Sequence, residues 1–322
     1  MAKQMIDQGL VEADISGARV RRVFGHQRQT AGEVAFKAAA SVALFLLALT
    51  FLYPFWFTII LSFSGFNDAL TLGLHIWPSE WNLEAYEFVF TENVIAVAYF
   101  NSIFRTAVGG ALTVVVTLMA AYPLSKKNLP GRTGITIYIL ITMFFSGGLI
   151  PTYLLIRSLG LLDRFIVLIL PVLAIGFYII IVRNFLMTVD IAYEESALID
   201  GANYLEILFR VIMPLAKPVM AVIFLWAAVY HWNEWFHWLI YMKSNSKLVL
   251  QMILRRLLIK ERELLEQVIE FGDPGDFTNQ QRLPPEALKA ATTLITIGPI
   301  ILLYPFLQRY FIKGIFVGSL KG

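Results

Sequence analysis

A charged stretch that carries glycine and proline interrupts an otherwise apolar chain, and it reads Glu194-Glu195-Ser196-Ala197-Leu198-Ile199-Asp200-Gly201-Ala202, then Ile207-Leu208-Phe209-Arg210-Val211-Ile212-Met213-Pro214. Apolar runs long enough to cross a bilayer flank it on both sides. A polar segment between two such runs must lie outside the lipid, because hydrocarbon offers its charges no water. There a soluble partner can bind it. The stretch therefore predicts a chain driven from the cytoplasm by another protein, rather than a self-sufficient pore.

The composition places the chain in a membrane. Of its 322 residues 58% are hydrophobic and only 15% are charged, and the mean hydropathy is +0.68. Soluble domains carry about 25% charged residues. A helical span needs about 20 apolar residues, and continuous rather than alternating runs predict helices, not a barrel. We predict an all-α membrane protein with six spans, near Ala38–Phe63, Ala96–Tyr122, Ile135–Ile156, Phe165–Val182, Val219–Met242 and Ala290–Leu307.

The distribution of basic residues predicts the orientation. The first 37 residues hold six Lys or Arg, whereas residues 64–95 hold five acids and no base. Basic residues concentrate on the cytoplasmic side, so the N-terminus is expected in the cytoplasm, and six spans return the C-terminus there. The outer segment 243–289 disagrees with its eight basic and seven acidic residues, but the rule weakens in long loops.

Four parts follow from this topology. They are a cytoplasmic tail over residues 1–37, a six-helix domain over 38–322, a cytoplasmic loop over 190–218 and an outer insertion over 243–289. Local signals add detail. Gly147, Gly148 and Pro151 predict a kink or break in span three, a capped helix is expected to begin near Asn82, and Leu248–Phe271 has helical periodicity.

The polar loop resembles a known motif. Glu195-Ser196-Ala197, then Gly201 separated from Val211 by nine residues, and Met213-Pro214 are similar to the EAA loop of ATP-binding-cassette importer permeases. The differences from that pattern, at Ser196, Val211 and Met213, are conservative. Further marks of MalG-like permeases of carbohydrate importers occur in order: Asn101-Ser102, Ala121-Tyr122-Pro123-Leu124, Leu149-Ile150-Pro151-Thr152-Tyr153, Leu159-Gly160-Leu161-Leu162-Asp163, Trp232-Asn233 and a tail Gly318-Ser319-Leu320-Lys321-Gly322.

The resemblance implies a type I importer permease in a bacterial cytoplasmic (inner) membrane. Its loop would dock in a nucleotide-binding subunit, with Glu195 pairing a basic residue there. The expected coupling residues are Glu194, Glu195, Ser196, Ala197, Asp200, Gly201 and Pro214. Glycine at 201 permits a sharp turn, and Pro214 is expected to stop the second short helix. The competing interpretation is a solvated loop without a partner.

Two further groups are candidates for the substrate path. Trp232-Asn233-Glu234-Trp235 offers rings for stacking on sugars and polar groups for their hydroxyls, and Tyr153 joins it from its motif. An interfacial aromatic belt with packing is the preferred interpretation. Arg105 is either a functional charge at depth or a side chain that snorkels outward. The break near Gly148 provides unwound backbone for a substrate or close helix packing.

No catalytic signature is present, so the chain is not expected to be an enzyme. It has no phosphate-binding Walker A pattern, no cysteine, and four histidines without metal-ligand spacing. ATP and Mg²⁺ would be bound by partner subunits. The expected partners are a second permease, two ATPase subunits, a solute-binding protein and an oligosaccharide. An ion-coupled secondary transporter, with Glu234 or Arg105 essential, is the main alternative, and an intramembrane enzyme would need more polar residues within the spans.

Overall fold

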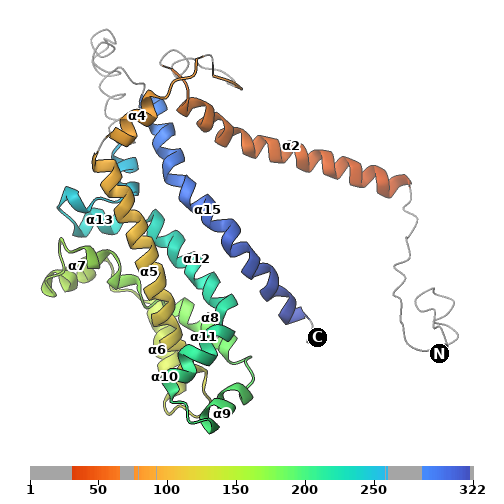
Figure 1. Ribbon diagram of the computed structural model, residues 1–322, viewed down its shortest axis with the longest axis vertical. Coiled ribbons are helices and arrows are strands. Elements are labelled where there is room, and N and C mark those ends of the chain that lie inside the picture. The colour runs from red at the N-terminus through yellow and green to blue at the C-terminus, as the bar shows by residue number, and fades with distance from the viewer. Residues whose placement is uncertain are drawn as a thin grey trace. The chain divides into compact units, whose positions relative to one another are not determined.

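The computed structural model describes residues 31–65, 76–78, 80–91, 93–257, 259 and 285–319. Within them the chain is helical, and the only extended pairing is an isolated bridge between Ser64 and Trp81. The predicted all-α class is confirmed. The helices (Figure 1) are α2 (Ala31–Ser62), α4 (Glu84–Thr91), α5 (Asn93–Ser125), α6 (Arg132–Phe144), α7 (Leu149–Ser158), η1 (Phe165–Leu168), η2 (Leu170–Val172), α8 (Gly176–Leu186), α9 (Ala192–Ile199), α10 (Tyr204–Glu206), η3 (Ile207–Ile212), α11 (Met213–Leu215), α12 (Lys217–Asn233), α13 (Phe236–Tyr241), η4 (Asn245–Lys247) and α15 (Pro285–Ser319).

The first span is a single long helix. Helix α2 has 32 residues and begins at Ala31, before the predicted start of the span at Ala38. The extra residues include Glu33 and Lys37, which lengthen the helix without extending its apolar run. Most α2 side chains are exposed within the chain itself, as expected of a helix whose surroundings are lipid or another subunit.

Between α2 and residue 257, α5 is the one described apolar segment that runs as a single long helix without a bend. Its 33 residues correspond to a length of about 50 Å. By contrast, the apolar segments that follow it are bent, by 113° between α6 and α7, by 50° before α8, and by 84° before α12. Two described helices are long and apolar enough to cross a membrane, or up to five spans if each bent pair counts as one. The count of six therefore stays a prediction.

The break in span three falls where the sequence predicted it. Helix α6 ends at Phe144 and α7 begins at Leu149, and Gly148 between them has a positive φ of 83°. Glycine adopts this conformation without the steric penalty of a side chain. The capped helix near Asn82 is also confirmed, because the Asn82 Oδ1 accepts the N–H of Glu84 at 2.7 Å at the start of α4.

Span five differs from its prediction. Instead of one helix to Met242, α12 ends at Asn233 and α13 begins at Phe236. The cause is a side chain that competes with the helical backbone. Glu234 Oε1 accepts the N–H groups of Phe236 at 2.6 Å and His237 at 3.0 Å, the pattern of a helix N-terminal cap. A new helix therefore starts here in place of continuing the old one.

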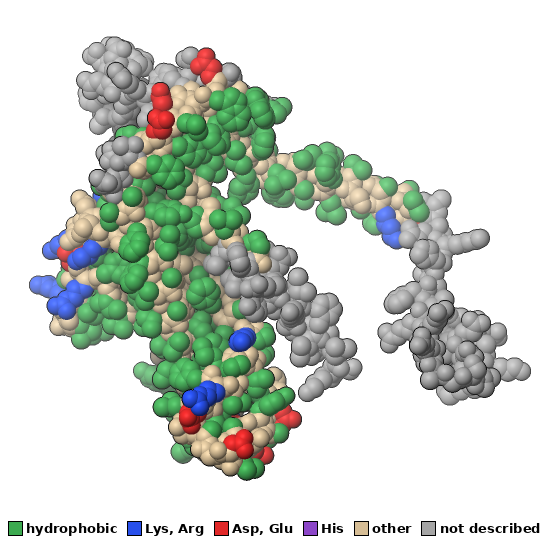
Figure 2. Space-filling view, in the orientation of Figure 1, with side chains coloured by type: hydrophobic (Ala, Val, Ile, Leu, Met, Phe, Trp, Pro, Cys, Tyr) green, Lys and Arg blue, Asp and Glu red, His purple; other side chains and the backbone are tan. Residues whose placement is uncertain are grey.

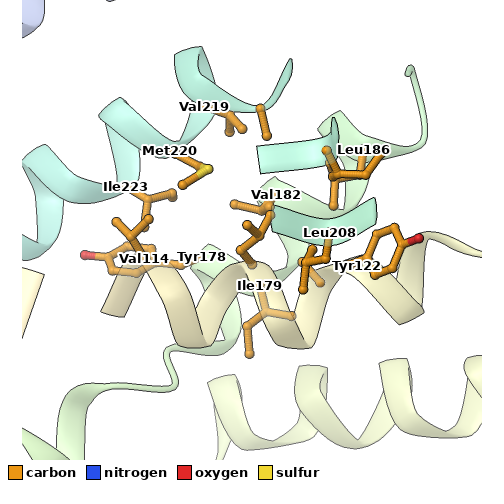
Figure 3. Close-up of a cluster of buried hydrophobic side chains, with 14 of the residues drawn as sticks. Val114, Tyr122, Tyr178, Ile179, Val182, Leu186, Leu208, Val219, Met220 and Ile223 are labelled. Atoms are coloured by element: carbon orange, nitrogen blue, oxygen red, sulfur yellow. The ribbon is translucent and has the colours of Figure 1, made fainter. Parts of the chain in front are cut away.

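Two apolar clusters hold the helices together along α5. The one drawn in Figure 3 joins α5, α8, η3 and α12 through residues such as Leu118, Val182, Leu208 and Ile223. The second gathers Trp232, Trp238 and Tyr241 with buried residues over 248–253. Helix α12 packs against both α5 and α15, and Figure 1 shows the three helices side by side.

The exterior fits a lipid environment. Figure 2 shows hydrophobic side chains over much of the visible face along α5, with charged groups at the lower end, where α9 lies, at the left beside α7 and at the top. The predicted outer helix Leu248–Phe271 is helical over 250–257, where Arg255 lies 3.4 Å from the ring centre of Trp235. Residues 258 and 260–271 of that prediction, and residues 1–30 of the predicted tail, lie outside the described residues.

Candidate coupling site

The polar loop folds as a helix, a tight turn and a second helix. Helix α9 starts where Asp190 Oδ1 accepts the N–H of Ala192 at 3.0 Å. It ends in a left-handed turn: Gly201 has a φ of 82°, and its N–H donates to the Leu198 carbonyl at 3.0 Å. A Cβ built on Gly201 would meet nothing within 4 Å, so glycine is needed there for its backbone conformation alone. The predicted turn is confirmed.

The second helix begins with a reciprocal cap. Asn203 accepts from the N–H of Glu206 at 3.0 Å, and Glu206 Oε2 accepts from the N–H of Asn203 at 3.1 Å. The chain then passes through a π-helical turn, η3, to α11. Pro214 does not stop this helix. It lies in the first turn of α11, where a missing N–H costs nothing, and the chain bends after it, at Ala216 before α12.

Apolar side chains fasten the loop to the membrane helices. Ile207, Leu208 and Ile212 are all buried, with exposed fractions of 0%, 4% and 3%, and they pack against α5 and α8 in the cluster of Figure 3. Burying each such side chain contributes about 1.5–3 kcal/mol where water is excluded. The loop is therefore a fixed part of the fold.

The opposite side of the loop exposes large apolar groups. Ile199 is 86% exposed. Four more side chains, two in α9 and two in α10, are between 40% and 64% exposed: Tyr193, Leu198, Tyr204 and Leu205. Glu195 and Ser196 are exposed beside them, and Asp200, Gly201 and Pro214 are exposed as well. Ala197 is half-buried and packs on the core. Exposed apolar side chains beside charged groups are typical of protein-binding surfaces, so this side of the loop is the candidate docking surface.

Glu194 points away from that surface. It is 7% exposed, accepts a hydrogen bond from the Tyr122 hydroxyl at 2.9 Å, and forms an ion pair with Lys126. Sequence reasoning grouped Glu194 with Glu195 and missed Lys126 and Tyr122 as its partners. The predicted topology could have suggested this pairing, because it places both the loop and Lys126, just after span two, on the cytoplasmic side.

The end of α5 beside this ion pair is held from two more elements. The carbonyl of Leu124 accepts from the Nε–H of Arg132 in α6 at 2.9 Å and from the Nε–H of Arg183 in α8 at 3.1 Å. The last carbonyls of a helix have no partner within it, and cations are favourable at that end. Four helices therefore meet at the C-terminal end of α5.

The predicted substrate-path residues gather around the break in span five, with different surroundings. Trp232 is buried, and its indole N–H donates to the Thr296 carbonyl at 2.8 Å. Asn233 is exposed and bonds Gln251 at 3.2 Å. Tyr153 stacks on Tyr241 with ring centres 6.3 Å apart. Packing thus accounts for Trp232 and Tyr153, whereas Asn233 keeps polar atoms at the surface.

The remaining two members, Glu234 and Trp235, are both half-buried. Besides the two backbone N–H groups, the Glu234 carboxylate accepts the Tyr230 hydroxyl at 2.9 Å. This carboxylate already has its hydrogen-bond partners, so it serves to cap α13. Sequence reasoning did not identify Tyr230, which is one helical turn away.

Arg105 lies fully inside the fold. It is 0% exposed, so of the two interpretations given above for this residue, the one in which its side chain snorkels outward is wrong. Its Nε–H donates to the Leu168 carbonyl at 3.1 Å and its Nη1–H to the Glu234 carbonyl at 2.7 Å. Both carbonyls sit where a helix ends or changes type, and such carbonyls lack a helical partner. Arg105 therefore ties α5 to the breaks in spans four and five.

Two cavities in the described part of the chain do not suit a sugar. One of about 490 Å³ lies between α4, α5 and α15 and includes Phe90 and Tyr99. Another of about 200 Å³ lies between α5, α12 and α15 and includes Phe224. Neither lining carries a charged side chain, whereas binding sites for polar ligands need placed donors and acceptors. Among the described residues no group of three or more His, Asp or Glu could hold a metal ion.

The comparisons with known proteins agree with this architecture. Residues 95–317 match the family described as binding-protein-dependent transport system inner membrane component. The chain is 40% identical to the protein LplC of Bacillus subtilis over 85% of this chain and 90% of that protein. It is 34% identical to the polygalacturonan/rhamnogalacturonan transport system permease protein YtcP of the same species, over 87% and 96%.

A solved structure is similar as well. A chain of a bacterial ABC transporter involved in the import of the acidic polysaccharide alginate superimposes with a TM-score of 0.78 at 29% identity, covering 88% of this chain and 99% of that one. The family match and this structural similarity thus define a transmembrane subunit of a transport complex. The chain belongs to the family of binding-protein-dependent transport system inner membrane components, among relatives that are permeases of carbohydrate ABC transporters.

Proposed function

We propose that this chain is one of two transmembrane subunits of an ATP-driven importer of oligosaccharides, including fragments of polysaccharides. The relatives named above support the substrate class, since one is a permease for polygalacturonan and rhamnogalacturonan and another belongs to an alginate importer. The chain would have six spans with both termini in the cytoplasm. It would act with a second permease, two ATPase subunits and a solute-binding protein.

The observation that carries the proposal is the rigid loop with an exposed apolar face. Its inner side is fixed by Ile207, Leu208 and Ile212, and its outer side presents Ile199, which is 86% exposed. In this role the face binds an ATPase subunit, and Glu195 supplies a charge at its rim. ATP binding would bring two such loops together and open the membrane cavity outward, so this chain does mechanical work and the ATPase does the chemistry.

A second permease would complete the path, since neither of the two cavities described above carries the charged groups that a polar ligand needs. A path between two permeases would place Asn233, Glu234 and Trp235 at the edge of a shared space, where Asn233 is the exposed member. Trp232 and Tyr153 would support that edge from within. Family membership argues against the ion-coupled secondary transporter, as does a Glu234 carboxylate that is already hydrogen-bonded.

The test is uptake of a labelled oligosaccharide into liposomes that contain the purified complex and ATP. Glu195→Ala and Gly201→Ala are compared with wild type. Alanine in a left-handed conformation costs about 1–2 kcal/mol, so Gly201→Ala should distort the turn and weaken ATPase association and uptake. Gly134→Ala is the matched control, because a Cβ there also meets nothing within 4 Å but Gly134 lies within α6 with no positive φ.

Size-exclusion chromatography of each variant separates loss of assembly from loss of transport. The proposal expects both loop variants to lose ATPase subunits while the permease remains folded. Full assembly and uptake in Glu195→Ala and Gly201→Ala would contradict it.

A further inference from the structure

Adjacent glutamates of α9 face opposite directions. Glu195 lies on the exposed face proposed to bind the ATPase, whereas Glu194 is 7% exposed and faces the end of α5. A residue turned inward cannot contact a partner subunit. Its ion pair with Lys126 and its bond from Tyr122 instead join the loop to span two.

The charges of this joint match the helix ends they occupy. Lys126 directly follows the last residue of α5, and Glu194 is in the first turn of α9. Helix dipoles favour a cation at a C-terminus and an anion at an N-terminus. The pair is also specific in geometry, because the buried Glu194 carboxylate would be an uncompensated charge without Lys126, whose side chain is about one-third exposed. The apolar contacts of the second loop helix have no comparable directionality.

The far end of α5 carries a second set of polar contacts. Asn101 donates to the Leu248 carbonyl at 2.8 Å, and the Ser102 hydroxyl accepts the N–H of Leu250 at 2.8 Å. Arg105 holds the breaks in spans four and five, as described above. Helix α5 is thus bonded to the loop at one end and to the segment after α13 at the other, with no break between.

We propose that Glu194 and Lys126 are positioning residues that make the loop and α5 move as one body, so that α5 carries the movement of the loop across the membrane. This inference rests on the proposed function. It assigns to Glu194 a task separate from ATPase binding. The apolar segments over residues 132–158 and 165–186 are bent by 113° and 50°, and α12 meets the second loop helix at 84°. A bend absorbs a push by changing its angle, whereas the unbroken α5 transmits it.

The chain offers a direct test, because it contains no cysteine. Glu194→Cys with Lys126→Cys removes the ion pair and provides two thiols that a short bifunctional methanethiosulfonate reagent can bridge. The complex is reconstituted in liposomes, and sugar imported per ATP hydrolysed is measured before bridging, after bridging and after reduction. Single variants Glu194→Gln and Lys126→Met are measured alongside.

Without the bridge we expect assembly and ATP hydrolysis to persist while sugar imported per ATP falls roughly tenfold, within the 5- to 150-fold range of measured couplings between sites. Bridging should restore the ratio and reduction should abolish it again. The matched control Lys127→Met removes an exposed neighbouring charge and should keep the wild-type ratio. If a single variant folds poorly, the bridged double variant still gives the answer.

Three results would overturn the inference. The first is a wild-type ratio in the unbridged double variant, and the second is a ratio that stays low after bridging. The third is loss of the ATPase subunits from Glu194→Gln, which would make Glu194 a docking residue. If the wild-type complex showed no ATP-driven uptake, the proposed function would be overturned instead, and with it the role inferred for Glu194 and Lys126.

Discussion

Asp163 shows how one side chain fixes the turn between α7 and η1. It has a positive φ of 56°, and its carboxylate accepts the Ser244 hydroxyl at 2.5 Å and the N–H groups of Lys243 and Ser244, both at 3.1 Å. These bonds, the Ser244 hydroxyl foremost, hold the pKa of Asp163 well below its usual range. The turn is thereby joined to the chain that follows α13.

The depressed pKa sets a pH dependence with a definite sign. A carboxylate whose pKa is lower in the folded state stabilises the fold above its unfolded pKa, about 3.9, and loses this contribution as the pH falls through the folded pKa. Asp163→Asn keeps the left-handed conformation accessible but removes the charge. We expect a lower melting temperature in detergent, with a constant deficit between pH 5 and pH 8 that narrows only in stronger acid.

The control for this prediction is Arg164→Gln, which changes an adjacent exposed charge. Its melting temperature should follow the wild type at every pH. A deficit in Asp163→Asn that disappears already between pH 8 and pH 6 would show that a different group is titrating.

At the scale of elements, the contact between α5 and α12 depends on one glycine. A Cβ on Gly109 would lie 2.5 Å from Nε2 of His231, a buried side chain. Gly109→Ala must therefore push the helices apart or displace the ring, and such overpacking costs about 1–3 kcal/mol. We expect a clear fall in melting temperature, recovered in part when His231→Ala is added.

Gly298→Ala is the comparison for this contact. Gly298 lies in α15, where a Cβ would meet nothing within 4 Å, so alanine should be neutral or slightly stabilising because of its better helix propensity. Equal effects at Gly109 and Gly298 would mean that helix propensity rather than close approach decides the outcome.

The sequence predicted those breaks whose cause is local. Gly148 and Gly201 could be identified from the sequence because only glycine accepts a positive φ freely, and both turns lie where expected. The break at Glu234 was not predicted, because it depends on a carboxylate folding back onto the N–H groups of Phe236 and His237. The prediction that Pro214 stops the second short helix gave this residue too much weight, because a proline in the first turn of a helix does not end that helix.

At the scale of the molecule, contacts between residues far apart in the chain could not be predicted from the sequence. The partners of Glu194 lie 68 and 72 residues earlier, at Lys126 and Tyr122, and no spacing rule connects them. Arg105 was seen as unusual, but its burial depends on carbonyls supplied by two other spans. The all-α class, by contrast, follows from the overall composition and from the length of the apolar runs, which need no knowledge of long-range contacts.

One prediction concerns the whole complex, namely which source of energy drives transport. If ATPase subunits drive the permease, uptake into liposomes should continue when a protonophore and a sodium ionophore collapse the ion gradients, provided that ATP is present. Uptake should cease when ATP is replaced by a non-hydrolysable analogue. Transport that stops at once on adding the ionophores would instead support an ion-coupled carrier and return attention to Glu234 and Arg105.

The π-helical turn at Ile207–Ile212 has a consequence for how the loop faces its partner. A π turn contains one residue more than an α turn, yet both complete one full rotation, which takes about 3.6 residues in an α-helix. Side chains before and after the π turn therefore keep nearly the phase that a continuous α-helix would give them. Deleting one residue within the π turn would relax it to α-helix and leave the apolar face aimed as before, whereas a deletion within α12 would rotate that face by about 100°. The π turn is thus a place where the loop can change its length by one residue while the docking face keeps its direction.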